Sequence, residues 1–452
     1  MTRQAARGLV ISAAILILVT GARLPATNAS REVDGQASII AASWAWTLAS
    51  PAGFGDCLPV GGCDNVRIRA LGSYGGRLYA GTTNVATGAE IWQHNGFTWT
   101  QQVQGGLGDQ QNTEIGSSAV YGGKLYAGTQ QSESAGAEVW AYDGIAWTRA
   151  LTGGFDQSTL PSDPKNIAAT ALTTFDNKLF IGTRYDYRGA EIWAYDGVTV
   201  TQVVSNGLVN AGNVAVFSLS SFAGNLYAGT LNRSGAEVWR SANGVQWTRV
   251  VTNGFNTTAN VAVSALAVMS NTLFAATENE TTGAEVWRSS DGLTWERILN
   301  GGFGNGALFK VNALTPYKGM LYAAASHASQ PLAEVWAYDG QAWARVVSGG
   351  LSSSNHLYTF YEATSLAVFN DTLYLGTSEA STGSTLTGPE VWSTTGPLPG
   401  APTPSPTATS PAARTATATA TTSATATAAR TATATPTTTP SALYIFLPII
   451  AR

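Results

Sequence analysis

One short phrase recurs along most of this chain, and it constrains the fold more than any other feature. Gly-Ala-Glu-(Ile/Val)-Trp, or a close variant, appears seven times, and each copy follows a second phrase close to Leu-Tyr-Ala-Gly-Thr. The copies end at Trp92, Trp140, Trp193, Trp239, Trp287, Trp336 and Trp392. Seven copies of a unit of roughly 50 residues are typical of a solenoid or a propeller.

The second unit shows what each repeat contains. Four short runs rich in Val, Tyr, Trp and Thr cover residues 117–121, 124–129, 137–142 and 146–151. Gly-Gly separates the first two runs and Asp-Gly the last two, and such dipeptides favour tight hairpin turns. Four short antiparallel strands make one propeller blade. The sequence therefore predicts an all-β fold, a seven-bladed β-propeller of four-stranded blades.

The two ends of the repeat array predict how the ring closes. Most units have a fourth run that begins with a second Trp, but after Trp392 the chain enters a proline-rich stretch. The missing run has a counterpart near the N-terminus, where Trp46 is followed by Gly53 and Phe54 at the offsets seen in other units. We expect the strand around Trp46 to pair with residues 363–392 and complete the last blade, which removes two exposed sheet edges.

Two hairpin motifs resemble those of known propeller families. Residues 142–144 (Tyr-Asp-Gly) with Trp147 are similar to the kelch motif, and residues 289–295 (Ser-Ser-Asp-Gly-Leu-Thr-Trp) resemble the Asp-box of sialidase-type propellers. The resemblance covers most of the repeat array and implies a propeller fold, because both motifs mark structural hairpins. Sialidase activity would also imply an Arg-Ile-Pro phrase, whereas Arg67-Ile is followed here by Arg69.

The regions around the repeats predict export. Residues 1–29 combine a basic start, an apolar run and a Thr-Asn-Ala cleavage site, as in a secretory signal peptide. Residues 30–395 are assigned to the propeller. Residues 396–441 are nearly all Thr, Ala, Pro and Ser, which predicts a disordered stalk, and residues 442–452 form a short apolar tail. The tail is too short to cross a bilayer, so we expect no membrane span once the signal peptide is removed.

The stalk and its Leu-Pro-Ile-Ile-Ala-Arg end resemble the tails of exported proteins of green non-sulfur bacteria. That resemblance implies a signal for surface sorting or anchoring. The alternative is that the tail is a sticky terminal strand. In both cases we expect the protein to be secreted or held at the cell surface.

Charge and cysteine content exclude some partners. Residues 30–395 hold all 28 acidic residues of the chain and 18 of its 24 basic residues, which argues against a nucleic-acid partner. Cys57 and Cys63 are the two cysteines, and their closeness in one loop of an exported chain predicts a local disulfide. Two cysteines without a nearby His do not make a zinc site, so we predict neither a metal nor a cofactor.

The innermost strands predict a site in the channel. One position, eleven residues before the Leu of the second phrase, carries Arg67, Glu114, Lys310 and Glu362 in units that neighbour one another in the ring. Asn312 lies two residues further on in the sixth unit. We expect charges of alternating sign around half the channel, with a small polar ligand at its mouth. The alternative is a water-filled channel whose charges neutralise one another.

Loops of varied length supply a second candidate surface. They join the second and third strands of a unit, or one unit to the next, and such loops on a rigid scaffold often carry binding residues. We expect Tyr185, Tyr187 and Arg188 to be exposed in one of them. The two tyrosines could then stack on sugar rings.

Two repeated polar residues are assigned structural roles. The Glu of the Gly-Ala-Glu-Val-Trp phrase occurs in every unit, whereas a reaction needs one asymmetric centre. We expect it to pair with an Arg of the neighbouring strand, such as Arg149 or Arg249. An Asn thirteen residues before the repeated Leu in five units is expected to bond the backbone as the chain enters the inner strand.

These features favour a monomeric, non-catalytic binding or adhesion module whose ligand is a saccharide. One alternative is a glycoside hydrolase or lyase that uses channel carboxylates, for which Glu114 and Glu362 are the candidate pair. Another is a scaffold that binds a surface protein. An acidic pocket holding a carboxyl with a raised pKa would favour the enzyme, and a broad apolar face would favour the scaffold.

Overall fold

The computed structural model describes residues 44–58, 62–131, 135–155, 165–328, 334–347, 351, 359–360, 362–381 and 386–396. Strands dominate these residues, and consecutive strands pair antiparallel. The predicted signal peptide, stalk and C-terminal tail lie outside the described residues.

Six repeats form four-stranded antiparallel sheets, called blades one to six in chain order. Their strands, from the inside outward, are as follows. Blade one comprises β4 (Arg67–Tyr74), β5 (Arg77–Thr83), β6 (Ile91–His94) and β7 (Trp99–Val103), and blade two comprises β8 (Asn112–Tyr121), β9 (Lys124–Gln131), β10 (Val139–Tyr142) and β11 (Trp147–Leu151). Blade three comprises β12 (Ala168–Phe175), β13 (Lys178–Arg184), β14 (Ile192–Tyr195) and β15 (Val200–Val204), and blade four comprises β16 (Ala215–Phe222), β17 (Asn225–Leu231), β18 (Val238–Ser241) and β19 (Thr248–Val251). Blade five comprises β20 (Ala262–Met269), β21 (Thr272–Glu278), β22 (Val286–Ser289) and β23 (Glu296–Leu299), and blade six comprises β24 (Leu308–Tyr317), β25 (Met320–His327), β26 (Glu334–Tyr338) and β27 (Trp343–Val347).

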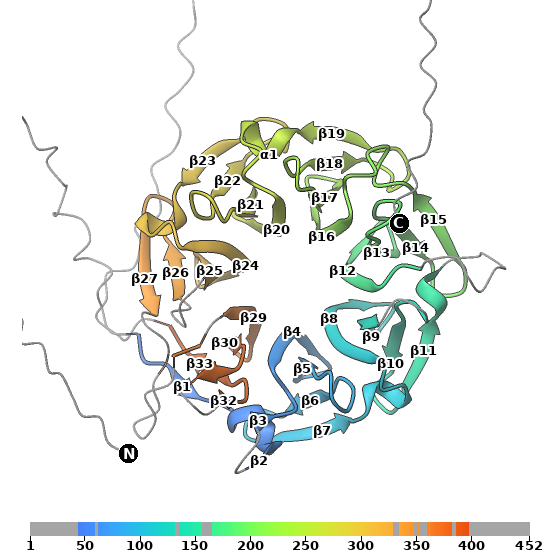
Figure 1. The fold of residues 1–452 in the computed structure, drawn as a ribbon, viewed down its shortest axis with the longest axis vertical. Helices are drawn as coiled ribbons and strands as arrows, with labels where there is room; N and C mark the ends of the chain where they lie inside the picture. Colours follow the sequence, from blue (N-terminus) through green and yellow to red (C-terminus); the bar gives the residue numbers. More distant parts are fainter. Residues whose placement is uncertain are drawn as a thin grey trace, which may run out of the picture. The chain divides into compact units, whose positions relative to one another are not determined.

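The closing blade, blade seven, is built from both ends of the described chain (Figure 1). β29 (Ala363–Phe369), β30 (Thr372–Thr377) and β33 (Val391–Thr394) pair in that order, and β1 (Thr47–Leu48) is the outermost strand. Leu48 lies opposite Trp392 in this pairing. The predicted closure by an N-terminal strand is therefore confirmed, and so is the all-β propeller fold.

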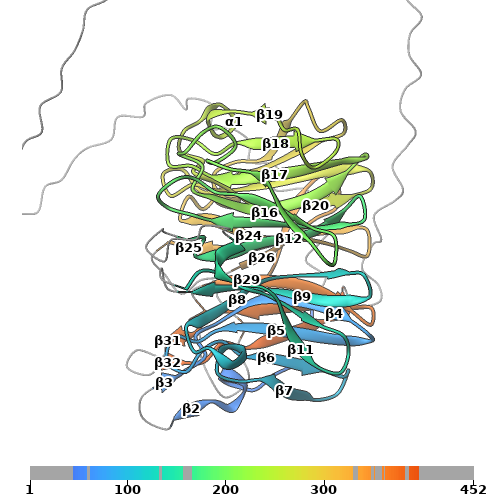
Figure 2. The ribbon, with the colours of Figure 1, turned by 90° about the vertical axis from the view of Figure 1, so that its right-hand side faces the viewer.

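Small elements decorate one side of the ring. β2 (Cys57–Leu58) pairs with β3 (Gly62–Cys63), while β28 (Thr359–Phe360), β31 (Ala380–Ser381) and β32 (Leu386–Thr387) form a small sheet. Figure 2 shows β2, β3, β31 and β32 together on the same side. All of them lie in loops that connect to the starts of inner strands or to the ends of second strands, where the longer loops were expected.

A tight turn with unusual backbone angles follows most outermost strands. These turns are η1 (Ala52–Gly55), η2 (Gly106–Gly108), η3 (Gly153–Phe155), α1 (Asn253–Asn256) and η4 (Gly302–Gly304). Each places a Phe or Leu at positive φ, for example Phe255 at 61°. Such a conformation costs roughly 1–3 kcal/mol for a non-glycine residue. Burial offsets that cost, because the Phe255 ring stacks on Trp287 of the next blade at a centroid distance of 4.6 Å.

The fourth residue of the Leu-Tyr-Ala-Gly-Thr phrase lies at the contact between blades and is small in every unit, with Gly in most units and Ala276 and Ala324 in the fifth and sixth. A Cβ added at Gly182 would lie 2.7 Å from Cγ1 of Val216 in the next blade. The repeated glycine therefore lets the inner strand of one blade pack directly against the second strand of its neighbour. This contact explains why a small residue recurs inside a strand, where strand propensity alone would favour a larger one.

The repeated Glu is the centre of a buried polar network. In blade two the Glu138 carboxylate accepts hydrogen bonds from Asn112 Nδ2 at 2.8 Å, Trp140 Nε1 at 2.8 Å and Arg149 Nη1 at 2.9 Å. The Trp-to-Glu bond recurs in every blade, and the Arg bond recurs in blades four, five and six. The predicted Glu–Arg pair is confirmed. Asn112 also donates to the Gly106 carbonyl, so it bonds backbone as predicted and carboxylate as well.

Candidate functional site

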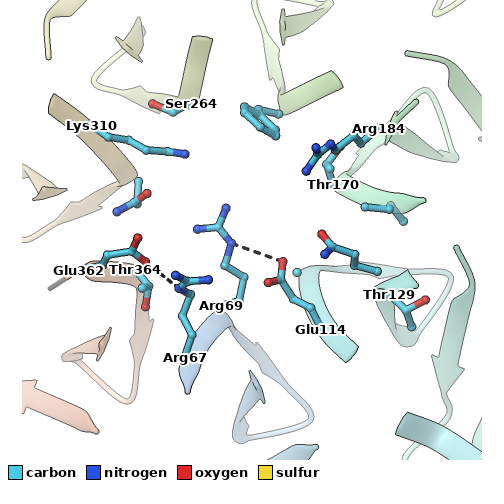
Figure 3. A pocket seen from close by; sticks show the side chains of 16 residues that line it. Arg67, Arg69, Glu114, Thr129, Thr170, Arg184, Ser264, Lys310, Glu362 and Thr364 are labelled. Carbon is cyan, nitrogen blue, oxygen red and sulfur yellow. Dashed lines mark ion pairs between the residues drawn. The ribbon is translucent and has the colours of Figure 1, made fainter. Parts of the chain in front are cut away.

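A cavity of about 390 Å³ lies in the channel, at the end where the inner strands begin (Figure 3). The ends of the second strands of blades two and three complete its wall. The sequence-predicted channel residues Arg67, Glu114, Lys310, Asn312 and Glu362 all line this one cavity. The structure therefore brings together residues from the first to the last unit of the repeat array.

Arg67 and Glu362 form one of the expected charge pairs. Arg67 Nε lies 2.7 Å from Glu362 Oε2, and the two side chains are 34% and 27% exposed. The pair joins blade one to blade seven, because Glu362 directly precedes β29. Solvent reaches both groups, so the pair contributes little to stability.

The arginine nearest to Glu114 is Arg69, which lies two residues after Arg67 on the inner strand of blade one. Its Oε1 lies 3.6 Å from Nε of Arg69, while its Oε2 accepts a hydrogen bond from Thr83 Oγ1 at 2.9 Å. Thr83 ends the second strand of blade one and pairs in register with Glu114. The seam between blades one and two therefore positions this carboxylate.

Lys310 likewise pairs with a residue that the inner strands alone do not reveal. Its Nζ lies 2.8 Å from Glu278 Oε2, because β21 and β24 pair at these two residues. Burial lowers the pKa of Lys310, the positive charge of Arg69 lowers it further, and Glu278 opposes both effects. The four charges of alternating sign line one cavity as expected, but Glu114 and Lys310 take their hydrogen-bond or ion-pair partners from the ends of second strands, at Thr83 and Glu278.

Asn312 has a structural role in the cavity wall. Its Nδ2 donates to Ser326 Oγ and, at 2.8 Å, to the Ala363 carbonyl of the next blade. Both hydrogens of the amide nitrogen are therefore used within the protein.

Similar bonds from small polar side chains join neighbouring blades around the ring. In each case a side chain near the middle of an inner strand donates to a carbonyl of the next inner strand. The bonds are Ser117 to Ala169, Thr170 to Val216, Ser218 to Val263, Ser264 to Val311, Asn312 to Ala363, and Thr364 to Ile68. Between blades one and two, where Arg69 and Ala70 occupy these positions, the described residues contain no such bond.

Several cavity residues were missed by sequence reasoning. Arg69, Arg184 and Phe217 line the space, and Glu278 supports Lys310 from behind. Arg184 is itself held by Asp186, at 3.0 Å from Nε and 2.9 Å from Nη2. A signal was present for Arg184 and Glu278, because each lies five residues after the repeated Leu, at the end of a second strand.

The loop prediction is correct for two residues of three. Tyr187 is 65% exposed and Arg188 is exposed, whereas Tyr185 is only 5% exposed. The backbone N–H of Tyr185 donates to the Val214 carbonyl at 2.8 Å, which fixes Tyr185 in the seam between blades three and four. Its ring meets the Tyr187 ring edge-on at 6.4 Å, so the two rings do not form a flat exposed platform.

Cys57 and Cys63 form a disulfide that closes the β2–β3 hairpin. The hairpin packs beside Gly53, whose added Cβ would lie 2.9 Å from Cys57 Sγ. Two further loops that were expected to vary, residues 156–164 and 352–358, lie outside the described residues.

The carboxylates of the cavity are positioned by neighbouring arginines. Glu114 and Glu362, the candidate carboxylate pair, both line the cavity, and each contacts a guanidinium group. Within the described ranges, no three His, Cys, Asp or Glu side chains gather closely enough to hold a metal ion. No helix in the described part of the chain is long and apolar enough to cross a bilayer.

Fold and cavity together define a β-propeller with an asymmetric polar cavity in its channel. No protein-family model matches the sequence, and no similar sequence was found among curated proteins. Solved structures do resemble it. A SapL1 lectin in complex with alpha methyl fucoside is 10% identical at a TM-score of 0.42, and the match covers 68% of this chain and 98% of the lectin.

Two further solved structures are similar over parts of larger proteins. The Trypanosoma rangeli sialidase in complex with 2,3-difluorosialic acid is 13% identical at a TM-score of 0.42, with 78% of this chain and 59% of the sialidase covered. A prolyl endopeptidase is 13% identical at a TM-score of 0.46, with 73% of this chain and 50% of the peptidase covered. This chain therefore spans little more than half the length of these two proteins.

Proposed function

We propose that this chain is an exported, non-catalytic propeller that binds a saccharide at the mouth of its channel. The observation that carries the proposal is the asymmetry of the cavity. Blades that otherwise repeat one sequence place Arg69, Lys310 and Glu362 in a single space. A repeat that only built a ring would need no more than the small residues that blades three and four have there, such as Ala168 and Ala215.

A saccharide fits the chemistry of the lining. Sugar hydroxyls both donate and accept hydrogen bonds, and the cavity offers guanidinium, ammonium, carboxylate and amide groups around one aromatic ring, Phe217. Its volume of about 390 Å³ lies within the range of small-molecule sites, roughly 300–1,000 Å³. A non-catalytic role is supported by Glu362, because its Oε2 lies 2.7 Å from Arg67 Nε, whereas glycoside cleavage needs two carboxyl groups that face the scissile bond.

The test is a glycan array probed with the purified chain and two double variants. Arg67→Ala with Glu362→Ala removes a channel pair without leaving a single charge behind. Arg288→Ala with Glu296→Ala removes an ion pair of the outer strands of blade five and is the control. We expect the wild type and the control to bind the same glycans, and the channel variant to bind them at least tenfold more weakly.

Three outcomes would contradict the proposal. Equal binding by all three proteins would move the site away from the channel. Binding to no glycan would refute the saccharide. Shortening of a bound glycan, detected by mass spectrometry, would refute the non-catalytic role and favour a hydrolase or lyase.

We also propose export and display at the cell surface, or secretion. The signal-like residues 1–29 and the Thr/Ala/Pro-rich residues 396–441 support this proposal. Sequencing the N-terminus of the mature protein tests it, with a start near residue 30 expected. A mature protein that retained residues 1–29 in the cytoplasm would contradict it.

A further inference from the structure

Arg69 interrupts a rule that the other blades keep. At six of the seven blade boundaries a Ser, Thr or Asn of the inner strand donates to a carbonyl of the next blade, as Thr170 does to Val216 at 2.6 Å. The boundary between blades one and two has Arg69 at this position, followed by Ala70. The chain has thus replaced a structural hydrogen bond with a long cationic side chain that enters the cavity (Figure 3).

The guanidinium of Arg69 is only weakly engaged by the protein. Among the described residues its one ion pair runs from Nε to Glu114 at 3.6 Å, beyond hydrogen-bond length. Figure 3 shows its two terminal nitrogens directed toward the middle of the cavity, and no hydrogen bond joins them to any described residue. The side chain is 28% exposed, so it is partly removed from water without a strong partner. A planar guanidinium with free terminal N–H groups matches a carboxylate, which it binds through two parallel hydrogen bonds.

Arg69 also differs from the other cations of the cavity in how closely a carboxylate compensates its charge. The cavity wall contains four cationic side chains and two carboxylates, and the cations are Arg67, Arg69, Arg184 and Lys310. Glu362 compensates Arg67, Asp186 compensates Arg184, and Glu278 compensates Lys310, each at 3.0 Å or less. Arg69 is therefore the least compensated cation of the four, and its charge is felt at Lys310.

We propose that the cavity takes a saccharide that carries a carboxylate, with the carboxylate on the terminal nitrogens of Arg69. The inference rests on the proposed saccharide function and names the class of sugar, a uronic or other carboxylated glycan. The ammonium of Lys310, 5.2 Å from the centre of the Phe217 ring, lies beside the one aromatic surface of the cavity. Phe217 supplies a face for the apolar side of the sugar ring, while Arg69 fixes its orientation.

The test compares acidic disaccharides with their methyl esters, which have nearly the same size and no charge. Calorimetry on the full purified chain would use glucuronate-, galacturonate-, mannuronate- and guluronate-containing disaccharides, with neutral and sulfated disaccharides in parallel. We expect at least one acid to bind ten times more tightly than its ester. Arg69→Gln should abolish that difference, and Arg69→Lys should retain part of it. Arg149→Gln, which removes an arginine of an outer strand, should retain all of it.

Each other result would overturn the inference in a distinguishable way. Equal affinity for acids and esters, or binding of neutral sugars alone, would refute recognition of charge and leave the proposed saccharide function standing. Tighter binding of sulfated than of carboxylated sugars would refute the carboxylate as the recognised group and favour a sulfate. Unchanged binding by Arg69→Gln, with its melting temperature also unchanged, would refute the residue assignment. Binding of no sugar would refute this inference and the proposed function together. The wild-type comparison of acid with ester decides the question even if a variant does not fold.

Discussion

Glu390 offers the sharpest test of the physical reasoning, because it is the repeated Glu with the fewest side-chain partners among the described residues. Glu138 in blade two accepts bonds from Asn, Trp and Arg, whereas the described partner of the Glu390 carboxylate is Trp392 Nε1 at 3.0 Å. Leu48 lies opposite Trp392, in the position that Arg149 takes opposite the Trp of blade two. Glu390 is only 5% exposed. Burial raises the pKa of Glu390 to about 7, and the Trp392 hydrogen bond lowers it only in part.

The direction of the pH effect follows from linkage. A carboxyl that binds its proton more tightly in the folded state stabilises the fold fully below its unfolded pKa of 4.5, and that contribution is lost as pH rises through about 7. Each tenfold change in proton affinity corresponds to about 1.4 kcal/mol, so the loss amounts to about 3 kcal/mol. Glu390→Gln keeps the shape and the bond to Trp392 but cannot ionise. We expect wild type and variant to be similarly stable at pH 4.5, and the wild type to be about 3 kcal/mol less stable at pH 8.

Urea unfolding from pH 4.5 to 8.5, followed by tryptophan fluorescence, measures this difference. Other titrating groups are common to both proteins, so the difference between the two curves reports Glu390 alone. Leu48→Arg is a second variant, because it supplies a cation at the place where other blades have one, and it should flatten the wild-type slope. Parallel stability curves for wild type and Glu390→Gln would refute the reasoning.

Three further predictions follow from the same contacts. Asn112→Ala should lower the free energy of unfolding by about 2 kcal/mol or more, and Arg149→Ala by about 1 kcal/mol or less, since Asn112 is fully buried and the Arg149 side chain is half exposed. Chemical denaturation measures both losses, and the reverse order would contradict the proposed network. Cys57→Ser with Cys63→Ser should lower stability by about 2 kcal/mol through the loss of a small closed loop, and an unchanged denaturation midpoint would count against it. The affinity for an acidic saccharide should fall as pH rises, because burial lowers the pKa of Lys310 and the positive charge of Lys310 assists the binding of an anion at Arg69. Calorimetry at increasing pH should show this fall in the wild type but not in Lys310→Gln, and a pH-independent affinity of the wild type would contradict the prediction.

Sequence-level reasoning went furthest where the structure is set by local contacts. Short runs rich in Val, Tyr, Trp and Thr, the Gly-Gly and Asp-Gly turns and the sevenfold phrase predicted the four-stranded unit, because each strand pairs with its nearest neighbours in sequence. The same reasoning found Trp46 as the marker of the closing strand, although 346 residues separate Thr47 from its partner Ser393. The repeat makes this prediction possible, because the strand that the last unit lacks can be recognised by its Trp before the first unit.

Contacts between blades limited the same reasoning. We expected Tyr185 to be an exposed loop residue, yet its side chain is buried and its backbone N–H bonds the next blade. Lys310 and Glu114 take partners from the ends of second strands, because those strands pair in register with the next inner strand. That register depends on how the blades pack, and it does not follow from the period within any one blade.

By itself, therefore, the sequence determined the blade, the way the ring closes, the structural role of the repeated Glu, and the five channel residues that were nominated. Only the tertiary structure decided which charges neutralise one another and which one remains available. The physical reason is that Glu114, the carboxylate that faces Arg69 from the neighbouring blade, is bonded by Thr83 and lies 3.6 Å from Arg69 Nε. How closely a charge is compensated across a seam is visible only once the seam is formed.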